Sequence, residues 1–539
     1  MATVLTSHPR RGPTVRRRDI LLLAVATLLS AMALAAGWPG GPTRPAGAAG
    51  PDEVRILSGA PATLDPAAQG DIGSAAVSAQ LFESVTAIDP SLTVRPALAG
   101  SWDVEDGGRR IVFHLRDALA FSDGSALGAA DVVRSWLRVI DPDRPSPLAS
   151  LMLDVEGAAE RLAGTVGEDG VALRATGNDV EVRLIRPAAD FVSIVAGPTF
   201  AVVPRDYDGD APVDPDTFVG SGAYVVSAET PTDLTLTAND RYWAGAPPIR
   251  TVRLVGDIGG RSSVAAFEDD DLDYAGISSS DASWIRFDAT LGPQLREVPS
   301  MSTEYLGFDT SRPPFADVRV RQAFARAVDW RRVVELATIE ATPANSMVPP
   351  GIPGRSDADF LPSHDPDAAR ALLAEAGYPN GTGFPVVTFL TGGSAYASGM
   401  IADVERVLGI DVRVETMDFD AYFDRLVADP PAIWSLGWVA DYPGRNDFLG
   451  VLLRSGQSNN YGRWSNPEFD AAIAEAGAAT DPDAANAAYD RAEAIVQREA
   501  PIVPLAYGPG WALSRDGLLG AGQNGLGILR MAGLAWVDQ

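Results

Sequence analysis

The sequence contains no cysteine and no lysine, and it has only three histidines. Without cysteine, the chain has no disulfides, thiolate metal ligands or cysteine nucleophiles, and no cysteine to carry an N-terminal lipid. His8 lies in the N-terminal segment considered below, so His114 and His364 are the only histidines left. Two histidines with no companion motif are too few for a histidine-built zinc, nickel or haem site. We therefore expect no metal site and no cofactor.

Basic residues are also scarce: there are 43, all arginine, against 71 acidic residues, and the formal net charge is −28. Nucleic-acid binding needs a basic face that neutralises phosphates, so the balance argues against that partner. One interpretation of the acidity is solubility. The other is a surface that favours cationic ligands.

Only one long apolar run occurs, Ile20 to Ala36, and it follows five arginines between positions 10 and 18. A Gly/Pro-rich stretch then leads to Ala46-Gly47-Ala48, the small-x-small pattern of a cleavage site. Residues 1–48 are therefore predicted to be an export signal, with a mature chain from Ala49. Arg17-Arg18 resembles a twin-arginine signal, and the general secretory route stays open. An uncleaved anchor is the alternative, since about 17 apolar residues is the lower limit of a bilayer span.

The remaining length is too great for one core, and helices alternate with short strands, which predicts α/β lobes. A strand is expected over 108–116, where Ile111, Phe113 and Leu115 alternate with polar residues. The clearest helix patterns cover 131–140, 315–330 and 365–381, with Asp131, Asp317 and Asp365 as the expected N-caps.

Several short motifs are set aside. "GAGQNG", residues 520–525, matches a dinucleotide-binding pattern by letters but lacks a βαβ context, so we interpret it as a flexible C-terminal loop. The acidic run 268–273 lacks the spaced ligands of a calcium loop, so we interpret it as a solvated helix end. No P-loop, zinc-protease or serine-hydrolase motif occurs.

A series of stretches, taken in order, resembles the family 5 extracellular solute-binding proteins of ABC importers. The series spans roughly residues 55 to 505. Its members are "ATLDPA" (62–67), "LFESV" (81–85), "GSGAYVV" (220–226), "NDRYWAGAPPI" (239–249), "AFEDDDLDYAGI" (266–277), "EYLGFDTSRPPFADVRVRQAFARAVD" (304–329), "LLAEAGYPNG" (372–381), "GWVADYPGRNDFL" (437–449), "YGRWSNPEFD" (461–470) and "EAPIVPL" (499–505).

The resemblance implies an α/β fold: a bilobal, periplasmic-binding-protein-like clamp of type II, in the three-domain variety, with a hinge between the lobes. Lobe I would cover 49–302 with a small domain inserted at about 88–197, lobe II would cover 303–504, and 505–539 would return to lobe I. Ligand would lie between the lobes, and closure would be a hinge motion.

The resemblance also implies the site. In peptide-binding members, the aspartate that matches Asp441 pairs with the ligand's α-ammonium, and the preceding tryptophan, here Trp438, lines the pocket. The backbone of Val439 and Ala440 would face the ligand, with Tyr442 beside it. Where relatives often have Asp-Pro, this chain has Gly-Arg, so Arg445 would meet a ligand carboxylate or pair with Asp441. The alternatives are a local turn role for Asp441 and a core role for Trp438.

The implied function is that of a monomeric substrate-binding protein outside the cytoplasmic membrane, free or tethered. It would bind peptides, or a similar zwitterionic or cationic solute, and deliver them to the permease subunits of an ABC importer without chemistry. Opines, sugars and chelates are other ligands of such proteins. Two alternatives are a membrane-tethered solute sensor and an envelope hydrolase. For the hydrolase the sequence offers no nucleophile–base pair.

Overall fold

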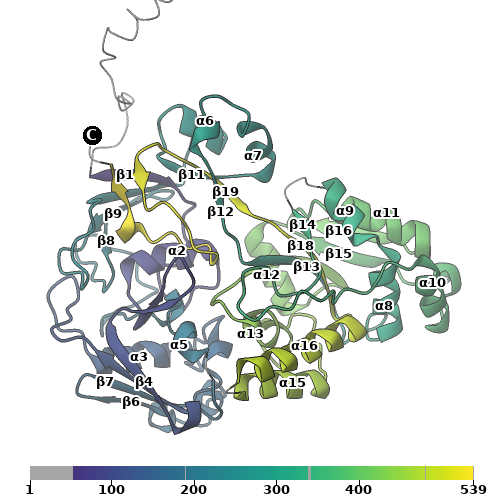
Figure 1. Ribbon diagram of the computed structural model, residues 1–539, viewed down its shortest axis with the longest axis horizontal. Helices are drawn as coiled ribbons and strands as arrows, with labels where there is room; N and C mark the ends of the chain where they lie inside the picture. Colours follow the sequence, from purple (N-terminus) through teal and green to yellow (C-terminus); the bar gives the residue numbers. More distant parts are fainter. Residues whose placement is uncertain (1–51, 189, 338–340, 480, 538–539) are drawn as a thin grey trace, which may run out of the picture. The chain divides into compact units, whose positions relative to one another are not determined.

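The computed structural model describes residues 52–537, apart from 189, 338–340 and 480 (Figure 1). The predicted export segment, its cleavage point before Ala49 and the alternative anchor lie outside the described residues. Of the helices in the described part of the chain, none combines the length and the apolar composition needed to cross a bilayer.

A seven-stranded mixed sheet holds the first strand of the described chain beside strands from its middle and its C-terminal part. Strand β1 runs parallel to β10 and β11, and its side chains alternate between buried Val54 and Ile56 and more exposed neighbours, as a half-covered strand does. In the order of the sheet its strands are β12 (Leu295–Val298), β19 (Gly510–Ser514), β11 (Tyr274–Ile277), β1 (Glu53–Leu57), β10 (Thr251–Val255), β9 (Leu234–Ala238) and β8 (Tyr224–Glu229); the helices in this part are α2 (Ile72–Leu81), α6 (Ser263–Glu268) and α7 (Ser279–Ile285).

A six-stranded sheet is built from one continuous stretch of chain, 302–507. Its strands in order are β14 (Thr342–Pro343), β18 (Ile502–Tyr507), β13 (Ser302–Phe308), β17 (Ile433–Val439), β15 (Val387–Thr391) and β16 (Val412–Thr416). The helices of the stretch are α8 (Val318–Ala327), α9 (Trp330–Ala337), α10 (Pro366–Glu375), α11 (Ala397–Leu408), α12 (Phe419–Ala428), α13 (Arg445–Phe448), α14 (Gly450–Leu453), α15 (Pro467–Ala478) and α16 (Pro482–Glu499).

A four-stranded antiparallel sheet is formed by strands between residues 99 and 183. Its core centres on Trp136, which is fully buried and meets the rings of Phe113, Phe191 and Phe200 edge-on. The strands are β4 (Ala99–Glu105), β5 (Arg110–Leu115), β7 (Asp179–Arg183) and β6 (Leu173–Thr176), and the helices are α3 (Ala129–Val139), α4 (Ala158–Leu162) and α5 (Phe191–Ile194). Two short ribbons pair β2 (Thr86–Ile88) with β3 (Val94–Pro96) and β20 (Leu518–Leu519) with β21 (Ala535–Trp536).

The six-stranded sheet separates two apolar cores. Leu306 and Phe308 of β13 belong to the core that includes α8, α10 and α11, whereas Tyr305 and Trp434 belong to the other, with α14, α15 and α16. Gly307 leaves room for the indole ring of Trp434 to lie across β13, because a Cβ there would overlap that ring. Helices α15 and α16 pack side by side over this second core (Figure 1).

The expected strand and three helices are present as β5, α3, α8 and α10, and one predicted N-cap, Asp131, is wrong. Asp317 and Asp365 cap α8 and α10 as predicted, and Gly377 after α10 has the positive φ of a helix stop. Helix α3, however, begins at Ala129 with Gly128 as N-cap, so Asp131 is the third helical residue. Its carboxylate accepts the N–H of Gly128 at 3.0 Å, because an acid one turn into a helix can reach back to the cap.

The chain crosses between the two large sheets twice, each time through a very short segment. Residues 299–301 join β12 to β13, and 508–509 join β18 to β19. The second crossing therefore begins after Tyr507, the last residue of β18.

Candidate ligand-binding site

The predicted site residues lie where β17 leaves the six-stranded sheet. Val439 is the last residue of β17 and pairs with Ser302 of β13. The N–H of Ala440 donates to the carbonyl of Met301 at 2.9 Å, so this amide is already used by the protein. The chain then turns through Asp441 to Gly444 and enters the short helix α13.

The carboxylate of Asp441 is desolvated and unpaired. Its Oδ2 atom is buried with no hydrogen-bond partner, and among the described residues no local N–H donates to the side chain. Burial raises the pKa of Asp441 to about 7, since the charged form loses hydration and gains no partner. The alternative that Asp441 merely caps its own turn therefore has no hydrogen bond to support it.

A small cavity of about 30 Å³ adjoins Asp441. That is room for a group of the size of one or two water molecules, or of an ammonium group. Segments far apart in the sequence form its wall, including Glu83, Ser84, Gly197, Asn524 and Arg530. A much larger cavity of about 970 Å³ lies elsewhere, between residues 58–64, 121–131, 204–219 and 229–234, and shares no lining residue with the first.

Asp447 is a second buried carboxylate beside Asp441. Its Oδ2 accepts the indole Nε1–H of Trp438 at 2.9 Å and the backbone N–H of Asp441 at 3.2 Å, while its Oδ1 is buried without a partner. Burial, followed by the nearby charge of Asp441, raises the pKa of Asp447 well above its ordinary value. Burial and mutual repulsion therefore both disfavour the ionised forms of this pair, and a cation that joined the two carboxylates would relieve that cost.

Trp438 packs into the protein core, as the alternative interpretation held, and its role as a wall of the ligand pocket stays a prediction. It is half-buried and packs against two apolar cores, and its indole N–H positions Asp447. Tyr442 is fully buried: its hydroxyl donates to Asp190 Oδ2 at 3.1 Å and accepts from Asn446 Nδ2 at 2.9 Å. These bonds give Tyr442 a structural role in the turn.

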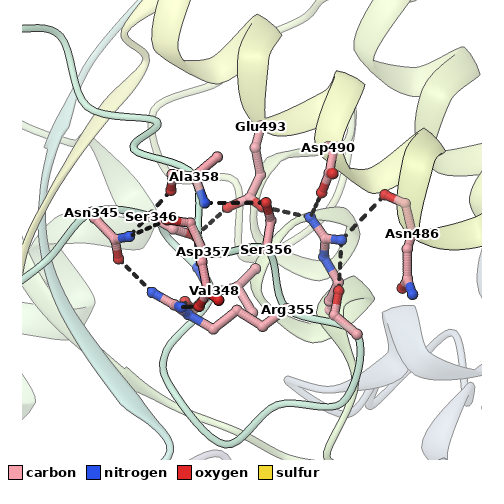
Figure 2. Close-up of polar contacts among 12 residues, drawn as sticks. Asn345, Ser346, Val348, Arg355, Ser356, Asp357, Ala358, Asn486, Asp490 and Glu493 are labelled. Atoms are coloured by element: carbon pink, nitrogen blue, oxygen red, sulfur yellow. Dashed lines mark hydrogen bonds and ion pairs between the residues drawn. The ribbon is translucent and has the colours of Figure 1, made fainter.

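Arg445 is buried in a network that does not include Asp441. Its guanidinium contacts three residues of α16, Asn486, Asp490 and Glu493, which are labelled in Figure 2. Nη2 pairs with Asp490 Oδ1 at 2.7 Å and with Glu493 Oε2 at 2.6 Å, and Nη1 donates to the carbonyls of Gly354 and Asn486. The expected alternative of a pair with Asp441 is thus not realised in the described chain. Binding of a ligand carboxylate by Arg445 stays a prediction.

The network continues into the segment after β14 (Figure 2). Ser346 donates its hydroxyl to Glu493, and Arg355 bonds Asn345 and the carbonyl of Val348. Because Arg445 is four residues from Asp441, these bonds anchor the turn that carries Asp441 to α16 and to residues 345–358.

Sequence reasoning missed three residues that line the cavity: Glu83, Asn524 and Arg530. Glu83 accepts from Tyr242 and Trp243 and pairs with Arg530 at 3.2 Å. The signal existed, because Glu83 lies in "LFESV" and the two aromatic residues lie in "NDRYW", both quoted for the resemblance. Asn524 lies in the "GAGQNG" segment that we expected to be a loose loop; its side chain is buried and accepts the N–H of Leu526 at 3.2 Å.

Comparison with known proteins identifies the family of the chain. The model described as "Bacterial extracellular solute-binding proteins, family 5 Middle" matches residues 93–460. The chain belongs to this family. Family 5 membership confirms the expected bilobal α/β clamp.

Two curated relatives and one solved structure illustrate the similarity. The probable deoxycholate-binding periplasmic protein YgiS of Escherichia coli (strain K12) is 30% identical over 468 residues, covering 83% of this chain and 86% of that protein. The periplasmic oligopeptide-binding protein OppA of the same strain is 26% identical over 512 residues, covering 92% of this chain and 93% of that protein. The structure of the Escherichia coli murein tripeptide binding protein MppA superposes with a TM-score of 0.82 at 26% identity, covering 92% of this chain and 100% of that one.

The family and these relatives are binding proteins, and the named relatives are periplasmic. In the described residues, no group of three or more histidine, aspartate or glutamate side chains is placed to hold a metal ion.

Proposed function

We propose that this family 5 protein binds peptides by their N-terminal ammonium group at Asp441 and delivers them to the permease of an ABC importer. The single observation that carries the proposal is the buried, unpartnered Oδ2 of Asp441 beside a cavity of ammonium size. A carboxylate that has already lost its hydration gains most from a cation that enters the site.

The names of the relatives offer two ligand classes, peptides and a bile acid. A bile acid is an anion at neutral pH, and its carboxylate would meet the acidic pair Asp441 and Asp447, whereas Glu83 at the same cavity is already balanced by Arg530. A peptide amine would neutralise the acidic pair. The charge of the site therefore favours peptides over deoxycholate for this chain.

In this proposal the protein works as a monomer outside the cytoplasmic membrane, and binding involves no bond-breaking step. Lobe I would comprise the seven-stranded and four-stranded sheets, with its inserted domain near 88–197, and lobe II would comprise residues 303–507. Trp438 forms a wall of the amine pocket, while Val439, Ala440 and Tyr442 shape the turn around it. The proposal assigns Arg445 to the support of that turn.

The test is the affinity of alanine tripeptides with a free or an acetylated N-terminus, measured by calorimetry on the wild type, Asp441→Asn and Asp411→Asn. Asp411 is exposed, so its variant controls for the loss of one charge. We expect acetylation or Asp441→Asn to weaken binding at least about tenfold, the size of a lost charged hydrogen bond. Acetylation of the peptide should have little further effect on Asp441→Asn. Equal affinity of the wild type for both peptides would refute the amine anchor.

A further inference from the structure

Arg186, which follows β7 in the domain of the four-stranded sheet, lies against a helix of the segment 302–507. A Cβ atom added to Gly477 would overlap the Nη1 and Cζ atoms of Arg186, so the guanidinium rests on the backbone of this glycine. Gly477 belongs to the last turn of α15. Any larger residue at this position would have to displace the arginine.

The domain of the four-stranded sheet holds the arginine in this orientation. Asp154 accepts the Nε–H of Arg186 at 2.9 Å and its Nη2–H at 2.6 Å, and both side chains of this bidentate pair are largely buried. Because both residues belong to the same domain, the pair does not depend on α15. The guanidinium therefore stays oriented toward Gly477 even when the two parts separate.

The last turn of α15 is a favourable place for a cation. The final carbonyl groups of a helix lack intrahelical donors, and the helix dipole places partial negative charge there. Helix α15 has no basic residue of its own in this turn. Arg186 therefore supplies from another part of the chain the positive charge that an arginine or lysine of the helix would otherwise supply.

A second set of contacts joins the same two parts. Tyr442, in the turn after β17, donates its hydroxyl to the carboxylate of Asp190 at 3.1 Å. The side chains of Tyr442 and Val451 also pack in the apolar core of the four-stranded domain, although both residues belong to the segment 302–507. The contact of Arg186 with Gly477 is thus one part of a wider interface between the two parts.

This interface can open without breaking either part. The pair of Arg186 with Asp154 stays intact, and Nη1 gains access to water, whereas in the contact it is buried without an acceptor among the described residues. Hydration of this charged nitrogen offsets part of what the helix contact contributes. A modest free energy, such as that of ligand binding, can then decide between the two arrangements.

We propose that Arg186 stabilises the closed arrangement of the two lobes in the ligand-free protein through its contact with α15. The inference rests on the proposed division into lobes, in which Arg186 belongs to lobe I and Gly477 to lobe II, and not on the identity of the ligand. Arg186 does not line the cavity of Asp441, so it acts on closure and not on recognition. A larger closed population strengthens the binding of every ligand of the closed form by the same factor.

The experiment follows the distance between the lobes by single-molecule fluorescence energy transfer. Because the chain has no cysteine, Asp169→Cys and Asp367→Cys create two labelling sites with no competing thiol, one exposed residue in each lobe. The labelled protein is freed of ligand by unfolding and refolding. It is compared with Arg186→Met, with Gly477→Ala, with the combination of these two, and with Arg183→Met. Arg183 is an exposed arginine of β7, so its variant controls for the loss of one charge.

We expect a compact population in the ligand-free wild type and in Arg183→Met. The ratio of compact to extended molecules should fall at least about threefold in Arg186→Met and in Gly477→Ala, as for the loss of a charge at a helix terminus. The combination should match Arg186→Met, because the added methyl group then has no guanidinium to displace. Gly477→Ala should not lower the unfolding temperature, since alanine suits a helix better than glycine, and this separates opening of the lobes from damage to the fold.

A wild type without a compact population would overturn the proposal. So would an unchanged ratio in Arg186→Met or in Gly477→Ala, or a further fall when the two changes are combined. Since no peptide is present, these outcomes are independent of the affinities that test the amine anchor at Asp441.

Discussion

The indole N–H of Trp438 donates a 2.9 Å hydrogen bond to the carboxylate of Asp447. The same oxygen accepts the backbone N–H of Asp441, so one carboxylate connects the tryptophan before the turn with the aspartate inside it. Asp447 therefore determines how Asp441 is presented to the cavity.

Replacing Trp438 by phenylalanine should reveal this connection. The change keeps most of the apolar surface but removes the one side-chain donor to Asp447 found among the described residues, and Asp447 is a buried acid with one oxygen already unpartnered. We expect a loss of about 1–3 kcal/mol in the free energy of unfolding, measured with urea. Trp284→Phe is the control, since Trp284 is exposed. Equal stability of the two variants would contradict a role for the bond.

The raised pKa of Asp441 predicts an unusual dependence of stability on pH. The folded ligand-free protein keeps a proton on Asp441 up to pH about 7, whereas the unfolded chain loses it near the ordinary aspartate pKa of 3.8. Between these values the folded state binds more protons, so this group makes the free energy of unfolding fall as pH rises, by up to about 1.4 kcal/mol per unit. Urea titrations at several pH values should show a flatter profile for Asp441→Asn than for the wild type. Identical profiles would mean that Asp441 is ionised in the folded protein.

Ligand affinity should change with pH in the opposite sense. A peptide amine is charged below its own pKa and needs an ionised Asp441, so affinity should rise from pH 5 to pH 7 as the carboxylate loses its proton. Calorimetry in buffers with different ionisation enthalpies would detect the proton released on binding. Binding that releases no proton at pH 6 would contradict this account.

Substitution of Arg445 can test whether this residue stabilises the fold or binds the ligand. Arg445→Met leaves Asp490 and the buried Glu493 without their cation, which should cost about 3–5 kcal/mol of unfolding free energy. Adding Glu493→Gln should restore part of the loss, because the uncompensated charge is removed. Arg491→Met on the same helix removes an exposed pair with Glu475 and an exposed hydrogen bond to the carbonyl of Ala487, and should have little effect.

The same variant addresses the prediction that Arg445 meets a ligand carboxylate. If its role is structural, amidation of the peptide C-terminus should change the affinities of the wild type and of Arg445→Met by the same factor. A penalty for amidation that is present only in the wild type would restore Arg445 to the ligand site.

Two glycines on neighbouring strands should respond differently to alanine. A methyl group at Gly307 would overlap the ring of Trp434, and overpacking of this kind typically costs about 1–3 kcal/mol. At Gly437 the nearest atom would be 4.0 Å away, so Gly437→Ala should leave the free energy of unfolding almost unchanged. Similar urea midpoints for the two variants would contradict the close approach at Gly307.

Local chemistry was predictable from the sequence and long-range contacts were not. Asp317 and Asp365 cap their helices because a cap depends on the next three residues. Asp441 and Trp438 were found through a family motif. The meeting of Glu83 with Arg530, 447 positions later, has no local signal. The ion pairs of Arg445 with Asp490 and Glu493 were not foreseen, because these partners reach it only through the packing of α16.

The two crossings between the large sheets lie next to each other. Val298 pairs with Gly510 across β12 and β19, and Glu304 pairs with Ala506 across β13 and β18. The stretch from Ser302 to Tyr507 therefore begins and ends on adjacent strands, as an inserted domain does when its two junctions lie side by side. Such a segment can be exchanged for that of a related protein by cutting the chain at two neighbouring junctions, because no other strand has to be rethreaded. In a protein with this connectivity, the segment that carries Asp441 can be replaced while the sheet that contains β1 stays unchanged.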